Sequence, residues 1–302
     1  MSGKADSLKT IFYALGANFV IFLSKLAAAV FTGSGALLAE AIHSLADCGN
    51  QILLLWGVRQ AKRPPSPDYP LGHGREVYFW SFMVALLLFS VGGIFSVSEG
   101  WHKLHDPQPL SMPWLAVGVL VFGIVAESMS MRACLQEVAK ARDGRSLYRW
   151  FRESRQAELV VIFGEDLAAL FGLGFALGAV VLTMLTGNPL YDAIGTLAIG
   201  VLLIAVALFV AIEVKGLLVG QGVDPAVHRA IYAWLNDRAE IRGVLSLITL
   251  QMGEQVMVSV QAQMDFSVRG DELVRQINAV ERALKQQFPA VRWMFFEPDE
   301  TD

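Results

Sequence analysis

The sequence contains few charged residues. Asp, Glu, Lys and Arg together make up 17% of its 302 residues, whereas 54% are hydrophobic. Because soluble domains usually carry about a quarter charged residues, this bias predicts an integral membrane protein surrounded by a lipid bilayer. The formal net charge of −4 gives no indication of a nucleic-acid partner, since nucleic acids bind basic surfaces.

Redox and catalytic motifs are scarce as well. Cys48 and Cys134 both lie in apolar stretches, which supports neither a disulfide framework nor a thiolate metal site. The sequence has no His-Glu-x-x-His motif and no recognisable nucleophile. We therefore expect neither an intramembrane metallohydrolase nor another enzyme, and no bound cofactor.

Long apolar stretches, by contrast, are abundant. Six of them are long enough to cross about 30 Å of hydrocarbon as helices. Short turns separate the first two (Gly33-Ser34-Gly35) and the last two, where Pro189 can open a helix. Residues 1–214 are thus predicted to form a six-helix transmembrane domain. The predicted spans cover residues 8–32, 35–59, 76–101, 113–138, 156–186 and 190–213.

Basic residues predict the orientation of these helices. They gather at the N-terminus and in the second and fourth loops, whereas the opposite loops offer only Lys103. The positive-inside rule therefore places both termini in the cytoplasm. Residues Met1 to Thr10 are polar, and the apolar run that follows is too long for a signal peptide. With no transit peptide visible, we expect a bacterial inner membrane.

The chain changes character from about Lys215. Two β-rich runs surround a tight Gly253-Glu254 turn, which predicts a hairpin. Helical periodicity occurs before and after this hairpin, and a last strand follows. Residues 215–302 are thus predicted to form a cytoplasmic α-β-β-α-β domain. The predicted helices cover 224–238 and 271–287, and the strands 244–252, 255–266 and 291–296.

Polar residues interrupt the second apolar stretch on one helical face. His43 and Asp47 are four residues apart, and Asn50 continues the same face. An imidazole and a carboxylate one turn apart can bind a divalent cation. Ionisable groups at membrane depth usually mark an ion or substrate pathway. The alternative is a core pair that satisfies itself.

The fifth stretch offers acids at a matching depth. Glu165 and Asp166 are adjacent, and Asp47 and Asp166 each lie roughly 16–18 Å from the helix end at 1.5 Å per residue. We predict a metal site formed by His43, Asp47, Asp166 and Glu165. The alternative is a pair of helix-helix hydrogen bonds between protonated carboxyl groups.

Further positions stay open. Glu127 and Asn50 are candidate relays for protons or metal, and the alternative for Glu127 in the fourth stretch is a carboxylate paired with Arg132. Lys25 in the first stretch needs a partner, and Glu40 and Asp192 are the candidates. In the second loop His73 and Asp68 form a weak candidate metal site, because two ligands alone say little.

These motifs, taken together, resemble the cation diffusion facilitator family. Some of them resemble more narrowly the branch that contains the mitochondrial zinc transporter nine. The resemblance covers nearly the whole chain. The family motifs are residues 34–47, the loop 70–75, six spans and an α+β tail, and the branch motifs are 50–51, 165–170 and 186–192.

The resemblance implies proton-coupled export of zinc or a similar divalent ion, and a homodimer whose tail domains have a ferredoxin-like fold. It also implies that Asp166 is a metal ligand. At the position four residues earlier, where much of the family has histidine or aspartate, this chain has Ile162. Glu165 as its replacement is our inference. The family also has a metal site in the second loop, formed by an acid and two histidines. Here those positions hold Ser66, Tyr69 and His73, so only one of the three ligands is present and we expect that site to be lost.

We therefore predict alternating access by rocking of the helix bundle, with ligand protonation releasing the ion. His43 suits proton exchange because its unperturbed pKa lies near 6.5. One nitrogen and several oxygens without sulfur suit Zn²⁺ but also admit Mn²⁺, Fe²⁺ or Co²⁺. The rival function is a non-transporting membrane sensor or scaffold that acts through the tail.

Overall fold

The computed structural model describes residues 3–142, 144–265 and 267–301, without the side chains of residues 3–14 and 17. Lys4 and Lys9, which contribute to the predicted orientation, are therefore outside the described side chains. The chain divides into two compact units. The first contains residues 1–57, 79–146 and 158–214, and the second contains 58–78, 147–157 and 215–302. The predicted domain boundary at 214/215 stays a prediction.

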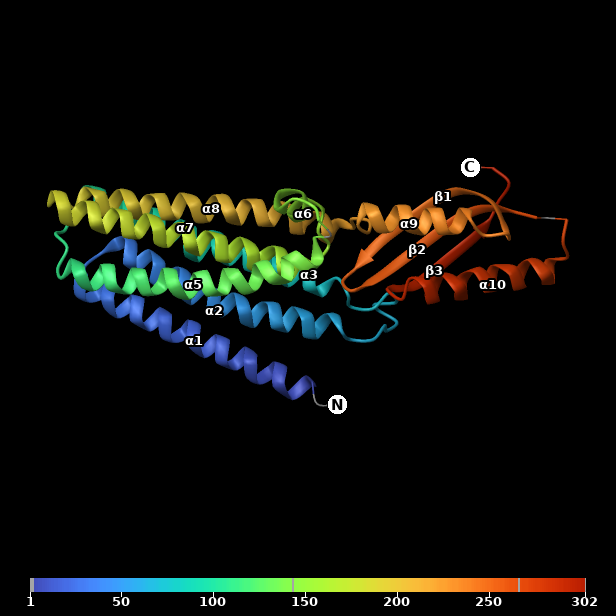
Figure 1. The fold of residues 1–302 in the computed structure, drawn as a ribbon, viewed down its shortest axis with the longest axis horizontal. Helices are drawn as coiled ribbons and strands as arrows, with labels where there is room; N and C mark the ends of the chain where they lie inside the picture. The colour runs from blue at the N-terminus through green and yellow to red at the C-terminus, as the bar shows by residue number, and fades with distance from the viewer. Residues whose placement is uncertain (1–2, 143, 266, 302) are drawn as a thin grey trace. The chain divides into compact units, whose positions relative to one another are not determined.

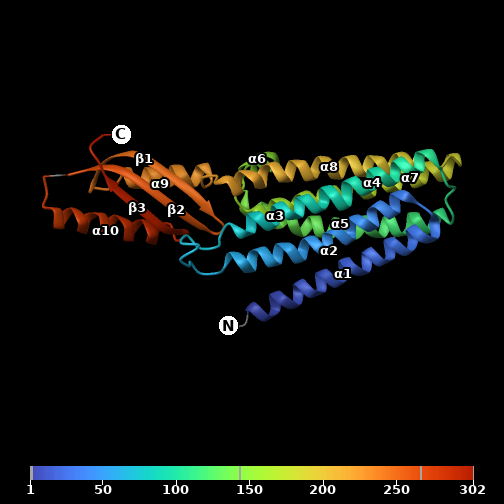
Figure 2. The same cartoon turned by 180° about the vertical axis from the view of Figure 1, so that it is seen from behind.

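The first unit is built from long helices that run alongside one another (Figure 1). Helices α3 and α4, largely hidden there, are visible from behind (Figure 2). These helices are α1 (Gly3–Thr32), α2 (Gly35–Ala61), α3 (Glu76–Leu87), η1 (Leu88–Ile94), α4 (Phe95–His105), α5 (Pro113–Ala141), α7 (Ala157–Thr186) and α8 (Leu190–Val219).

Two glycine turns define one end of this bundle. Gly33 joins α1 to α2 at φ +70°, and Gly187 joins α7 to α8 at φ +69°. Glycine is favoured there because a side chain strains the left-handed backbone. We call this end the turn side and the opposite end, where α2 ends at Ala61, the loop side.

Among the described residues, four helical segments are long and apolar enough to span a membrane. The prediction of six spans is thus confirmed for four of them. Helix α2 has 27 residues, roughly 40 Å at 1.5 Å per residue, but its polar residues make it too hydrophilic by composition. The described part of α1 includes the apolar segment Asn18–Thr32, which is shorter than a full span. The four spans are Glu76–His105, Pro113–Ala141, Ala157–Thr186 and Leu190–Val219.

The third predicted span is not one regular helix. A π-helix, η1, separates α3 from α4. A Cβ on Gly93 would lie 2.6 Å from Ile204 Cγ1, and a Cβ on Gly100 would lie 2.7 Å from the backbone nitrogen of Leu197. Glycine is therefore required where η1 and α4 approach α8.

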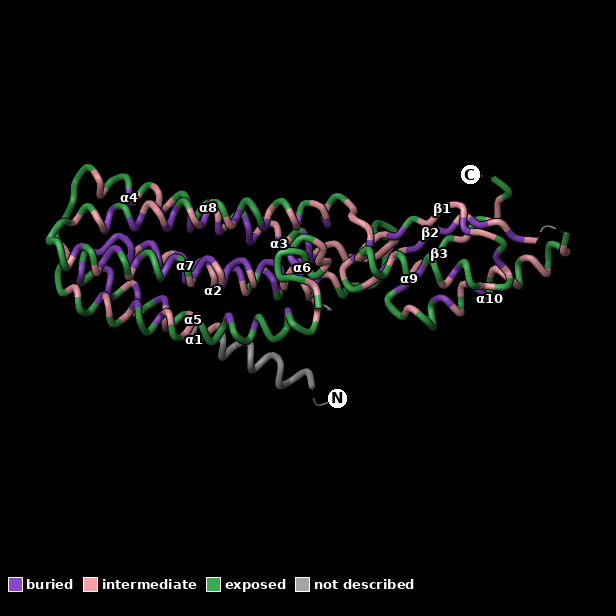
Figure 3. The backbone as a smooth tube through the Cα atoms, turned by 45° about the horizontal axis from the view of Figure 1, so that its top comes forward, coloured by how far each residue is buried: buried purple, intermediate pink, exposed green. Residues whose placement is uncertain are grey.

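The main core cluster of the bundle lies mostly in its turn-side half. Leu37, Leu120 and Leu173 are completely buried there and come from α2, α5 and α7. Buried positions recur along these helices in Figure 3. The turn-side half is therefore closed by packed apolar side chains. The cluster also includes Ala28, Ala29, Ala36, Ala39, Leu88, Ala116, Ala168, Ala176, Val180, Ile199, Leu203 and Ala207.

The second unit contains a three-stranded sheet in the order β1-β2-β3, as well as the short helix α6 (Leu147–Glu153). Strands β1 and β2 are antiparallel, and β3 is parallel to β2. The order α-β-β-α-β is the one the sequence predicts, whereas α6 was not predicted. The elements are α9 (Pro225–Asn236), β1 (Ile241–Met252), β2 (Gln255–Met264), α10 (Gly270–Gln287) and β3 (Val291–Pro298).

One face of this sheet is buried against α9 and α10. Ile231 and Leu235 of α9 and Leu284 of α10 share a core with alternate residues of the strands. Alternate burial along β2 is what a sheet covered on one face requires. The hairpin turns at Gly253, whose φ is +66°.

Candidate metal site

The site helix, α2, brings its polar side chains to one face as predicted. His43 is completely buried, and its Nδ1 lies 3.7 Å from Asp47 Oδ1. That separation is too long for a hydrogen bond. Neither ring nitrogen of His43 has a hydrogen-bond partner among the described residues. The imidazole therefore keeps its lone pair available.

Asp47 opens into a polar pocket of about 230 Å³ within the bundle. The pocket brings together acids from three helices: Asp47 on α2, Glu127 on α5, and Glu165 and Asp166 on α7. His43 does not line it. The other lining residues are Asn18, Gln51, Leu54, Leu55, Ser130, Ile162 and Ala169.

Neutral hydrogen-bond donors hold the two α7 acids. Asn50 Nδ2 donates to Glu165 Oε1 at 2.5 Å, and Ser130 Oγ lies 3.2 Å from Asp166 Oδ1 and 3.3 Å from Oδ2. Asn50 is completely buried, and Glu165 and Asp166 are nearly so. These bonds fix the acids without cancelling their charge.

The predicted ligand set is only partly assembled. No three His, Cys, Asp or Glu side chains in the described part of the chain are arranged to hold a metal ion. Asp47, Glu165 and Asp166 share the pocket, and His43 is connected to it through Asp47. The four-ligand site therefore stays a prediction. It requires His43 to turn or α2 to move relative to α7.

The pocket has no basic lining residue, as far as the structure describes it. Lys25 lies in the bundle but pairs with Glu40, with 3.2 Å between Nζ and Oε2. The sequence allowed Glu40 or Asp192 as the partner of Lys25, and in the structure the partner is Glu40. Asp192 pairs with Lys103 instead, at 3.3 Å.

Glu127 lies in the pocket, as a ligand or proton carrier requires. Sequence reasoning did not single out another lining residue, Ser130. The signal was available, because Ser130 follows Glu127 by three residues, which places both on one helical face. Gln51, which belongs to the branch motif 50–51, also lines the pocket.

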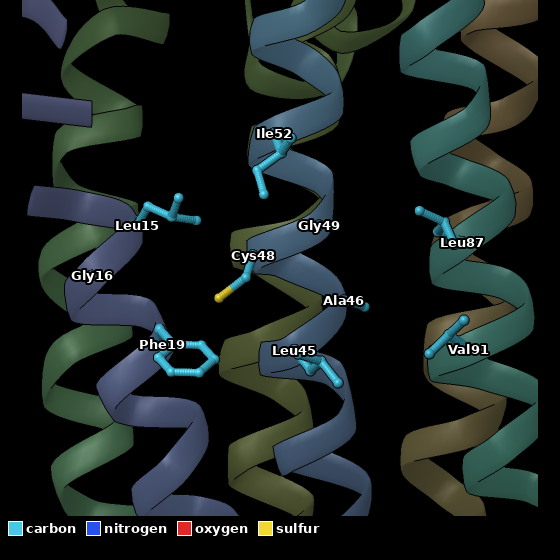
Figure 4. Close-up of a pocket in the computed structure, with 10 residues that line it drawn as sticks. All are labelled: Leu15, Gly16, Phe19, Leu45, Ala46, Cys48, Gly49, Ile52, Leu87 and Val91. Carbon is cyan, nitrogen blue, oxygen red and sulfur yellow. The ribbon is translucent and has the colours of Figure 1, made fainter. Parts of the chain in front are cut away.

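A second, larger hollow in this unit is chemically different. Its volume is about 700 Å³, and its wall comes from α1, α2 and the junction of α3 with η1 (Figure 4). Phe19, Leu45, Ile52 and Val91 make it apolar, and Cys48 is its one thiol. With no charged lining residue among those described, it offers no ligand to a metal ion.

The weak loop site is not assembled around its two predicted residues. His73 Nδ1 lies 3.9 Å from Glu76 Oε1, and its ring packs against the Tyr69 ring, with the centroids 4.3 Å apart and the planes tilted by 38°. Asp68 is exposed. The contacts of His73 thus favour a structural role in the loop, and a metal site at His73 and Asp68 stays a prediction.

Comparison with known proteins places the chain among cation efflux proteins. The family model of the cation efflux transmembrane domain matches residues 11–219. The proton-coupled zinc antiporter SLC30A9, mitochondrial, from Xenopus laevis is 34% identical over 86% of this chain and 47% of its own length. The human protein of that name is 31% identical over 86% and 46%, respectively. The cation-efflux pump FieF of Pectobacterium atrosepticum is 25% identical over 89% and 85%.

These relatives correct one prediction and confirm another. The predicted bacterial inner membrane, with its cytoplasmic termini, is wrong, because the SLC30A9 relatives are mitochondrial proteins by name. That prediction rested on the start of the chain, yet the chain spans about half the length of these relatives. The resemblance read from the motifs is confirmed. With a match over residues 11–219, the chain belongs to the cation efflux family.

Proposed function

We propose that this chain carries a divalent cation, zinc, across a membrane in exchange for protons. In this proposal α1 and α2 also cross the bilayer, so that six helices surround the pathway. The observation that carries the proposal is the pocket in which Asp47, Glu127, Glu165 and Asp166 meet.

The charge of this pocket explains why it would bind a cation. Grouping carboxylates away from water costs free energy unless a positive charge compensates them. No basic residue among the described lining residues provides that charge, and Lys25 is engaged by Glu40. A divalent cation or protons can compensate the acids, and the two exclude each other on the same oxygens.

The ligand types suit zinc. Asp47, Glu165 and Asp166 supply oxygens, and His43 would supply a nitrogen once it turns into the pocket. Such a set also binds Mn²⁺, Fe²⁺ or Co²⁺, and the relatives named as zinc antiporters favour zinc. Asn50 holds Glu165 in place, and Glu127 is suited to relay a proton or to complete the ligand set.

The direction of access also supports a carrier. The polar pocket extends from Asp47 along α2 to Leu54 and Leu55 on the loop side. The turn-side half is closed by the buried core cluster. The structure thus fits a state open to the loop side, and release on the turn side requires the helices to rock.

Location and assembly are part of the same proposal. The relatives named as mitochondrial favour a mitochondrial membrane. The sheet domain of residues 215–302 is proposed to have the ferredoxin-like fold of the family and to join two copies of the chain in a homodimer.

Transport in proteoliposomes tests this function. The purified chain is reconstituted, a pH gradient is imposed, and uptake of Zn²⁺, Mn²⁺, Fe²⁺ and Co²⁺ is measured. Asp47→Ala should abolish zinc uptake, whereas Glu99→Gln, a membrane-helix acid outside the pocket, should transport at the parental rate. Parental uptake by Asp47→Ala would refute the site. No flux from the parent protein would favour a sensor or scaffold instead.

A further inference from the structure

We propose that Glu40 is a second ligand for the transported ion, used on the way to the turn side, and that Lys25 replaces the ion there when the path is empty. This inference rests on the proposed function. It assigns a role to a buried carboxylate that lies outside the pocket.

The position of Glu40 fits an ion path. It precedes His43 by three residues on α2, so the two side chains lie about one turn apart on the same side, with Glu40 nearer the turn side. Glu40 is completely buried, and its Oε1 has no hydrogen-bond partner among the described residues. Oε1 and both His43 ring nitrogens are therefore neighbouring buried ligand atoms without hydrogen-bond partners.

A line of polar groups leads from the pocket to Glu40. A small cavity of about 10 Å³, about the size of one water, is bounded in part by Asp47, Glu127 and Ser44. Ser44 Oγ in turn accepts a hydrogen bond from Lys25 Nζ at 2.8 Å, and Lys25 contacts Glu40. The polar groups thus continue beyond the pocket into the turn-side half, next to the apolar core cluster.

Small residues on the neighbouring helices leave room for these groups. A Cβ on Gly123 of α5 would lie 3.4 Å from Lys25 Cε. A Cβ on Gly172 of α7 would overlap Oε1 of Glu40. The free oxygen of Glu40 thus faces α7, the helix that carries Glu165 and Asp166. If α7 moved outward, Oε1 would become accessible to an ion held by His43.

Stability alone does not explain this ion pair. A buried salt bridge usually contributes little, because desolvation offsets the attraction between the charges. Apolar residues such as Leu37, Leu120 and Leu173 fill the surrounding core and would suit these positions as well. A carboxylate here is useful if a cation passes, and the Lys25 ammonium compensates its charge between passages.

Four variants separate this role from a structural one. The first, Glu40→Gln, keeps the size of the side chain but removes a metal-binding oxygen, and the second, Glu40→Asp, keeps the carboxylate. The third, Lys25→Met/Glu40→Gln, removes both charges, so that neither is left unpaired in the core. The fourth, Glu99→Gln, is the control. Zinc binding to the detergent-solubilised protein and zinc uptake into proteoliposomes are measured for each.

An exit ligand predicts a loss in rate and not in binding. Glu40→Gln should bind zinc within about twofold of the parent, since the pocket is intact, while its maximal uptake rate falls about tenfold or more, as is typical when a metal-site residue is lost. The double variant should stay equally slow, and Glu40→Asp should recover part of the rate.

Three results would refute the role of Glu40 or the function on which it rests. Parental uptake by Glu40→Gln would exclude Glu40 as a ligand. Parental uptake by the double variant would show that the pair only balances charge. If Glu40→Gln fails to fold, the double variant and Glu40→Asp decide whether Glu40 is a ligand. An inactive parent would refute the proposed function itself, whereas an active parent together with parental uptake by Glu40→Gln would refute only the role of Glu40.

Discussion

Replacing Asp192 with alanine is expected to destabilise the bundle strongly, because this side chain holds the start of α2 from α8. Its Oδ1 accepts hydrogen bonds from Ser34 Oγ at 2.5 Å and from the Ala36 nitrogen at 3.4 Å. Its Oδ2 accepts from the Gly35 nitrogen at 2.7 Å and from Lys103 Nζ at 3.3 Å. Only 2% of Asp192 is exposed.

The magnitude follows from these contacts. Loss of a helix N-cap costs about 0.5–2 kcal/mol. Removing one partner of a buried ion pair costs about 3–5 kcal/mol, and Lys103, at 13% exposure, retains some access to water. We therefore expect Asp192→Ala to lower the free energy of unfolding by about 3 kcal/mol or more. Asp192→Asn keeps one acceptor oxygen and should cost about half as much.

Denaturant unfolding of the purified protein in detergent measures both losses. Asp106→Ala, in the exposed turn-side loop, is the matched control and should change the free energy by less than about 0.5 kcal/mol. A double-mutant cycle with Lys103→Met isolates the ion pair. If Asp192→Ala were no more destabilising than Asp106→Ala, the capping of α2 from α8 would be wrong.

Three other outcomes are expected. Gly100→Ala should cost about 1–3 kcal/mol, because its Cβ would lie 2.7 Å from the Leu197 nitrogen; Gly118→Ala, with open space around it, is the control. Zinc should raise the melting temperature of the parent and a chelator should reverse this, whereas Asp47→Ala should show no shift. Hydrogen bonds from the Ser267 side chain and backbone lower the pKa of Asp265, so Ser267→Ala should raise that pKa. An NMR titration that gave Asp265 the same pKa in the variant and the parent would contradict this.

The sequence predicts the elements of this fold well where one physical signal dominates. Apolar length predicts the four spans Glu76–His105, Pro113–Ala141, Ala157–Thr186 and Leu190–Val219, and alternation around Gly253 predicts the β1–β2 hairpin. The polar residues of α2 are the reason it does not qualify as a span by composition, although they are also what makes it the candidate site helix.

The candidate site is less predictable than the helices. Helical spacing places Asp47 and Asn50 on one face, and matching depth relates Asp47 to Asp166. The sequence does not determine how α2 is rotated relative to α7. It therefore does not reveal that Asn50 holds Glu165 or that His43 lies outside the pocket. Those details depend on packing between residues more than one hundred positions apart.

Long-range polar pairing also escapes sequence reasoning. Lys25 has two acids within reach by depth, and only the structure shows that Glu40 takes it while Asp192 caps α2. The π-helix is invisible for a similar reason, since an apolar stretch with two glycines is equally compatible with a regular helix.

The wide turn of η1 sets the angular register of everything that follows it in the third span. A residue is about 100° around an α-helix from the next one. A turn of π-helix holds one residue more than a turn of α-helix, so deleting Ser90 from η1 would let the segment wind as an ordinary α-helix while residues 95–105 kept close to their present orientation. Gly100 would still face Leu197, and Lys103 would still face Asp192. Such a shortening would thus leave both attachments of α4 to α8 in place.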